Sequence, residues 1–151
     1  MVKFVDQQLT QLRNEVYRMW AMVYSQMDQA RQAVLAMDRN IAQQIWVRER
    51  LVDAQDIKID TQVEDFIALY TPVAVDLRFV LAMLKINSDL ERIGDYAYSI
   101  ARFVKETDAE KLDAALVDRL QLERMFDIVL EMMNGLQASP MDENPSTAAS
   151  G

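Results

Sequence analysis

The scarcity of glycine and proline constrains this chain more than any other feature of its sequence. Only Pro72 and Gly94 interrupt the first 134 of its 151 residues, and the other two glycines and two prolines all lie beyond that point. Sheet proteins need turn residues at frequent intervals, because each strand must be followed by a reversal of the chain. The sequence therefore predicts a small number of long helices joined by short turns.

Apolar residues recur in steps of three and four along the chain, which is the spacing of one helix face. The first segment, over residues 5–37, carries a second apolar row beside the first, wide enough to contact two neighbouring helices. The segment Asp38-Arg39-Asn40 supplies a turn and an N-cap for a second helix, and Thr71 ends that helix because the residue before a proline avoids the helical region. Pro72 suits the first turn of a third helix.

The rest of the sequence predicts one further helix and a tail. An apolar stripe runs from Leu112 to about Leu136, and Gly135 is a fitting stop signal. Residues 138–151 are small, polar and interrupted by proline, which predicts a disordered tail. We therefore expect an all-α fold, in which a long antiparallel three-helix bundle over residues 1–107 is followed by a fourth helix over residues 108–137.

The charged composition limits the chemistry and the partners of the chain. It has no histidine and no cysteine, which excludes disulfides, thiol nucleophiles, histidine bases and metal sites that need nitrogen or sulfur ligands. The formal net charge of −8 disfavours binding to nucleic acids or to anionic membranes. Its charge-free runs are far shorter than the roughly 20 residues of a membrane span, so we expect neither membrane insertion nor a signal peptide. The absence of cysteine is compatible with the cytoplasm.

Two pairs of acids stand out by their position on the helices. Asp56 falls on the apolar stripe of the second helix with Asp60 one turn later, and Glu91 and Asp95 flank the stripe of the third. Burying an unpaired carboxylate costs several kcal/mol, so such a group should reach solvent, pair with a base or hold a cation. Because seven pairs of acids stand four residues apart, spacing alone does not separate a metal site from a charged surface. Gly94 beside Asp95 indicates either a close approach by a backbone or ligand or a tolerated defect.

Two stretches of the third helix carry a family resemblance. Residues 72–78 read PVAVDLR and residues 84–101 read LKINSDLERIGDYAYSIA. They resemble the PhoU family of phosphate-uptake regulators, whose pattern is P-V-A-x-D-L-R, then L-K-I, then D/E-L-E-R-I-G-D-x-A-x-x-I. The segment from Asp53 to Asp60 also resembles the helix that precedes this pattern in the family. The positions that match the family motifs outside the two acid pairs are Asp53, Asp76, Arg78, Asp89, Arg92 and Gly94.

The resemblance implies a fold of tandem three-helix repeats, with acid-x-x-x-Asp motifs that bind metal in some members. By position these motifs are Asp56 with Asp60 and Glu91 with Asp95; the resemblance favours iron, with zinc, manganese and magnesium as the other candidates. It also implies a cytoplasmic negative regulator of the phosphate-starvation response. Such a regulator contacts the ATPase of the phosphate ABC transporter and a sensor histidine kinase, and it is not an enzyme.

The length of the chain departs from that of family members with both repeats. It holds one repeat and a helix resembling the start of a second, so it is either a fragment or a short protein that pairs with another copy. In the second case the fourth helix, with Met125, Met132 and Met133, is the expected homodimer surface, although methionines at this spacing also suit an ordinary core. The alternative function is that of a metal-free helical adaptor. A ferritin-like enzyme is disfavoured because its Glu-x-x-His motifs need histidine.

Overall fold

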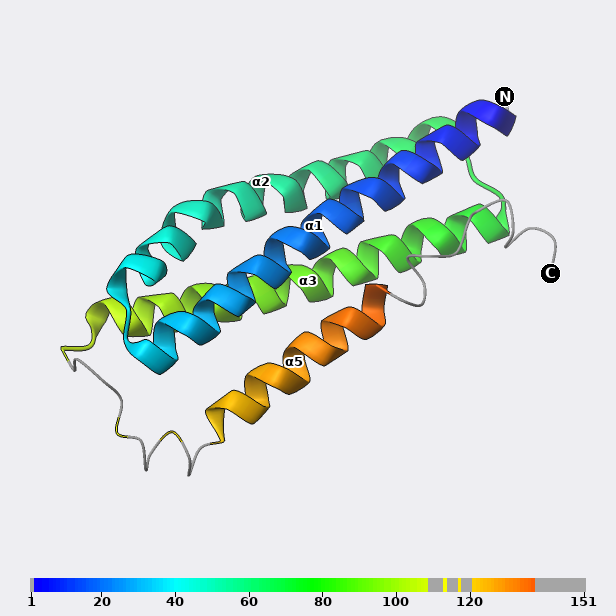
Figure 1. The fold of residues 1–151 in the computed structure, drawn as a ribbon. Helices are drawn as coiled ribbons and strands as arrows, with labels where there is room; N and C mark the ends of the chain where they lie inside the picture. The colour runs from blue at the N-terminus through cyan, green and yellow to red at the C-terminus, as the bar shows by residue number, and fades with distance from the viewer. Residues whose placement is uncertain (1, 109–112, 114–116, 118–120, 138–151) are drawn as a thin grey trace.

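The protein is a bundle of helices, described by a computed structural model over residues 2–108, 113, 117 and 121–137. Three long helices run antiparallel to one another in chain order, and a shorter fourth helix lies along the first (Figure 1). No strand occurs in these residues, so the predicted all-α class and the three-helix bundle with an additional helix are confirmed. The helices are α1 (Val2–Ala36), α2 (Arg39–Tyr70), α3 (Ala74–Glu106) and α5 (Leu122–Gln137).

The turn between α1 and α2 is fixed by one left-handed residue and one cap. Met37 adopts φ 47°, and the backbone N–H of Asp38 donates to the carbonyl of Ala33 at 2.9 Å, which closes the end of α1. The carboxylate of Asp38 then accepts hydrogen bonds from the backbone N–H groups of Asn40 (2.9 Å) and Ile41 (3.2 Å). Asp38 is therefore the N-cap of α2, as the sequence predicts.

The turn between α2 and α3 differs from the prediction by two residues. Thr71 ends α2 in the left-handed region, with φ 41° and ψ 67°. Val73 is extended and is the N-cap of α3, which begins at Ala74. Pro72 thus lies before the cap and not in the first turn, because the chain uses both residues after Thr71 to reverse direction.

The core lies between α1, α2 and α3 and is almost entirely apolar. Gln26 is an exception at 1% exposed, and its amide nitrogen Nε2 donates to the backbone carbonyl of Ile45 at 3.0 Å. A Cβ atom added to Gly94 would meet only the side chains of Val52 at 3.5 Å and Val23 at 3.6 Å, which is ordinary contact. Among the described residues, neither a backbone nor a ligand-sized opening explains this glycine, so it is a tolerated defect in the helix.

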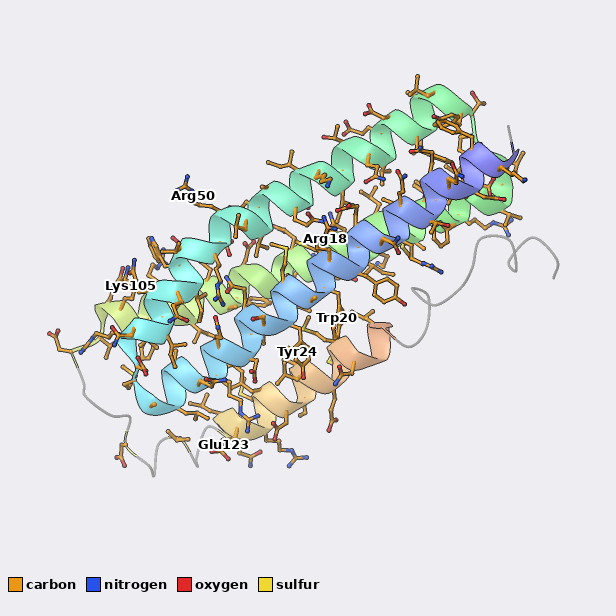
Figure 2. All side chains as sticks on the ribbon, turned by 45° about the horizontal axis from the view of Figure 1, so that its top comes forward. Arg18, Trp20, Tyr24, Arg50, Lys105 and Glu123 are labelled. Atoms are coloured by element: carbon orange, nitrogen blue, oxygen red, sulfur yellow. The ribbon has the colours of Figure 1, made fainter. Side chains whose placement is uncertain are left out.

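The fourth helix packs mainly along α1, over a cluster of small residues that α1 and α3 share. Phe126 and Leu130 are buried there, in one cluster with alanines of both helices, Ala30, Ala33, Ala97 and Ala101. Trp20 and Tyr24 point from α1 toward α5 (Figure 2), and their rings stack with centroids 5.1 Å apart. The indole N–H of Trp20 donates to the carbonyl of Met133 at 2.6 Å, which fixes the end of α5 to α1.

The start and end of α5 differ from the sequence-based prediction. The helix begins at Leu122, directly after Gln121 with φ 51°, so a single helix does not run from Leu112 to Leu136. Gly135 lies inside α5 without a positive φ, and the helix continues to Gln137. The predicted tail over 138–151 lies outside the described residues, and the division into 1–107 and 108–137 stays a prediction. No helix in the described part of the chain has the length and apolar character that crossing a bilayer requires.

Candidate metal centre

A row of six carboxylates follows the line along which α2 faces α3. Four come from α2 at successive steps of four, three and four residues, a spacing that keeps them on one helix face. Two come from α3, one turn apart. We call this row the acidic seam; its members are Glu49, Asp53, Asp56 and Asp60 of α2 and Glu91 and Asp95 of α3.

The antiparallel packing of α2 and α3 determines which acids meet. The rings of Trp46 and Tyr98 stack with centroids 4.6 Å apart at one end of the seam, and the ammonium group of Lys105 lies 4.4 Å from the centre of the Trp46 ring. Asn87 donates to Asp56 nearer the other end. Each step forward along α3 therefore matches a step backward along α2, which places Asp95 beside the first two acids of the seam.

Three acids of the seam lie close enough to share one cation. Ligand oxygens of Glu49, Asp53 and Asp95 all lie within 4.8 Å of one another, and they form the one such group of three among the described residues. The Oε2 atom of Glu49 is buried and has no hydrogen-bond partner. Of the four acids predicted as metal ligands, only Asp95 belongs to this triad; Glu49 was not predicted, and Asp53 was predicted only as a motif position.

The other predicted pair lies further along the seam and meets an amide. The Nδ2 atom of Asn87 donates to the Oδ1 atoms of Asp56 at 2.8 Å and of Asp60 at 3.4 Å. Both aspartates are half-buried, whereas Asn87 is fully buried. Glu91 lies between this pair and the triad along α3, one turn after Asn87 and one turn before Asp95. The two predicted pairs therefore share one seam but not one cation position.

The acidic seam concentrates negative charge, and the pKa values of its members reflect this. Burial and the charges of Asp53 and Asp95 raise the pKa of Glu49 from 4.5 to about 7. Burial and the charge of Asp60 raise the pKa of Asp56, although the hydrogen bond from Asn87 opposes this change. Burial and interactions with Asp95 raise the pKa of Glu91 as well. None of the salt bridges among the described residues involves an acid of the seam.

The segment that matches a known protein family contains the whole acidic seam. The PhoU domain family matches residues 16–104, which contain all six acids. The chain belongs to the PhoU family.

Several curated PhoU homologues share a substantial part of the sequence. The protein of Deinococcus radiodurans is 40% identical over 101 residues, which cover 66% of this chain and 46% of the relative. That of Clostridium acetobutylicum is 34% identical over 110 residues, or 72% and 50% of the two chains. That of Thermotoga maritima is 25% identical over 143 residues, or 95% and 61%. Each is named a phosphate-specific transport system accessory protein PhoU homolog, the last one as homolog 1.

The chain spans about half the length of the curated PhoU relatives it matches. No solved structure matches it. Family membership therefore rests on the match over residues 16–104 and on the identities with these relatives.

Most of the remaining PhoU motif positions lie off the acidic seam. Asp76 is half-buried in the first turn of α3, where burial and the charge of Asp6 raise its pKa. Arg78 and Arg92 are exposed, and Asp89 is half-buried on the same side of α3 as Arg92. The geometry gives these residues no part in the candidate metal centre.

The donor atoms of the seam fit a hard divalent cation. All are oxygens of carboxylates or of an amide, which suit Mg²⁺, Mn²⁺ and Ca²⁺, whereas Zn²⁺ prefers nitrogen and sulfur ligands. The buried, unpartnered oxygen of Glu49 is a vacant acceptor that a cation would satisfy. The PhoU sequence motif and the geometry thus lead to the same helix pair, with Glu49 as the member that only the structure reveals.

Proposed function

We propose that this protein is a regulator of phosphate uptake and of phosphate-starvation signalling, and that it acts by binding other proteins in the cytoplasm and not by catalysis. The observation that carries the proposal is the PhoU domain match over residues 16–104, together with relatives named as accessory proteins of phosphate-specific transport. The partners we propose are the ATPase of the phosphate ABC transporter and a sensor histidine kinase. The regulator would restrain the starvation response.

A direct binding experiment tests these partners. The full chain, labelled at its N-terminus, is titrated with the purified transporter ATPase and with the purified cytoplasmic part of the sensor kinase from the same organism. We expect saturable binding to at least one of them, and lower output from a phosphate-starvation reporter when the chain is expressed. An absence of binding to both, with an unchanged reporter, would contradict the proposal and favour an adaptor of another transporter.

The second part of the proposal is that the acidic seam binds metal. Glu49, Asp53 and Asp95 would hold one cation, since their oxygens already lie within 4.8 Å of one another. Asp56, Asp60 and Glu91 extend the seam and are the other proposed ligands. The cation would neutralise charges that the fold brings together without any base. By donor chemistry Mn²⁺ and Mg²⁺ fit best, and by family resemblance iron is the further candidate.

The third part of the proposal is that two copies pair through the outer face of α5. Met125, Ile128 and Met132 lie on this face at steps of three and four residues and are 56%, 46% and 65% exposed. Met133, predicted for the same surface, is instead fully buried against the core. Antiparallel pairing about a two-fold axis brings Arg124 of one copy near Glu131 of the other, whereas parallel pairing would set like charges together.

A single charge on this face is expected to separate the dimer. We expect Met132→Glu to be monomeric in sedimentation equilibrium at concentrations where the unmodified chain is dimeric, because it places a carboxylate in the apolar contact. Leu69→Glu is the matched control, since Leu69 is 73% exposed on α2. A monomeric unmodified chain, or a dimer that only Leu69→Glu disrupts, would contradict pairing through α5.

A further inference from the structure

Among the described residues, Asn87 is the one fully buried polar side chain that faces the acidic seam. Its residue is 0% exposed, and its Nδ2 atom donates to both Asp56 (2.8 Å) and Asp60 (3.4 Å). Its Oδ1 atom is buried as well and has no hydrogen-bond partner in the described part of the chain. The amide therefore satisfies the carboxylates while leaving its own acceptor without a donor.

A buried acceptor without a donor destabilises a folded protein, so its position needs an explanation. A leucine branches at the same carbon and would occupy this place in α3 without an unsatisfied polar atom. The two ends of the amide differ in chemistry: the NH₂ group replaces a cation as a donor to carboxylates, whereas the carbonyl oxygen is itself a ligand for hard cations. A half-turn of the amide plane exchanges these two ends without moving the backbone.

We propose that the side-chain amide of Asn87 can turn over and bind a cation together with Asp56 and Asp60. This cation position is separate from the triad of Glu49, Asp53 and Asp95. Without a cation, the NH₂ group holds the two carboxylates. With a cation, the amide turns over and Oδ1 becomes a neutral third ligand. This inference rests on the proposed metal binding of the seam, and it adds a ligand that is not a carboxylate.

The experiment compares three variants by thermal unfolding with and without Mn²⁺. Asn87→Leu removes both ends of the amide, and Asn87→Asp keeps an oxygen ligand but removes the donor. Gln26→Leu is the matched control, because Gln26 is also a buried amide with an unpartnered oxygen, but its NH₂ group bonds to a backbone carbonyl. Isothermal titration with Mn²⁺ gives the affinity of each variant.

We expect opposite orders of stability in the two conditions. Without metal, both variants should unfold below the temperature of the unmodified protein, because Asp56 and Asp60 lose their donor. Asn87→Asp should be the less stable of the two, because a third carboxylate joins the pair. Asn87→Leu should bind Mn²⁺ roughly 10- to 100-fold more weakly at this position. In Asn87→Asp, the rise in unfolding temperature on adding Mn²⁺ should equal or exceed that of the unmodified protein. Gln26→Leu should keep the full shift on adding Mn²⁺.

Amide resonances provide a second measurement on the unmodified protein. The side-chain NH₂ signals of Asn87 should move on titration with diamagnetic Mg²⁺, as their hydrogen bonds to carboxylates are lost. If Asn87→Leu keeps the full Mn²⁺ affinity, or if these signals stay fixed while Mg²⁺ binds, Asn87 has only a structural role and the inference is wrong. If the unmodified protein binds neither cation, the proposed metal function fails first.

Discussion

Replacing Glu49 with glutamine is expected to stabilise the metal-free protein at pH 8 and to leave its stability unchanged near pH 4.5. The pKa of Glu49 is raised from 4.5 to about 7 by burial and by the charges of Asp53 and Asp95. The folded protein binds the proton of the Glu49 carboxyl more tightly than the unfolded chain does. Below pH 4.5 the carboxyl is protonated in both states, so it does not lower the free energy of unfolding. Its cost grows as the pH rises and is complete above pH 7.

The size of this effect follows from the pKa difference. A change from 4.5 to about 7 corresponds to at most about 3 kcal/mol of destabilisation above pH 7. Glu49 is half-buried, so solvent screening reduces the expected gain in Glu49→Gln to about 1–2 kcal/mol. Urea denaturation of both proteins at pH 4.5, 6 and 8 in the presence of EDTA measures the free energy of unfolding directly.

The control for Glu49→Gln is the same substitution on an exposed part of the same helix. Glu64 is exposed on α2 and belongs to no salt bridge among the described residues. Glu64→Gln should show no comparable difference between pH 4.5 and pH 8. Equal stabilities of Glu49→Gln and the unmodified protein at pH 8 would show that the seam tolerates the charge of Glu49 without cost.

Addition of a divalent cation is also expected to stabilise the unmodified protein. A cation whose free concentration is 100 times its dissociation constant stabilises a folded protein by about 2.7 kcal/mol. For a chain of this size that corresponds to a rise in melting temperature of roughly 5–10 °C. We expect this rise on adding Mn²⁺ at pH 7.5 and its reversal by EDTA. The rise should diminish below pH 6, because protons compete with the cation for the carboxylates.

Asp95→Asn should abolish most of this rise. Asp95 is exposed and is the ligand that α3 contributes to the triad, so its loss should not prevent folding. Asp65→Asn is the matched control, because Asp65 is an exposed acid of α2 that lines a polar groove with α1, away from the seam. An equal rise in Asp95→Asn and the unmodified protein would place the cation elsewhere.

The fold was predictable where single residues determine helix ends. Asp38 ends one helix region and caps the next, and Thr71 and Pro72 force the second reversal. The start of α5 was not predictable, since nothing in the sequence marks Gln121 as the residue that adopts φ 51°. That boundary depends on how Phe126 and Leu130 pack against the alanines of α1 and α3, which is a property of the packed structure.

The sequence predicts which helix faces carry the candidate site, but not which acids of the two helices meet. Glu49 and Asp53 stand seven residues before Asp56 and Asp60, so the sequence already places all four on one face of α2. Which of them meets Asp95 depends on the register of α2 against α3. That register is visible in the stacking of Trp46 on Tyr98 and in the hydrogen bond from Asn87 to Asp56, and neither contact can be deduced from spacing.

The seam lies between two fixed points, the aromatic stack at one end and the tight reversal after Tyr70 at the other. The stack and the reversal hold α2 and α3 together at both ends of the seam, so its like charges stay close in the folded chain. Folding of the three helices thus brings the carboxylate oxygens of the seam together before any cation binds. A cation bound between these carboxylates would relieve their repulsion, and that relief would contribute to its affinity.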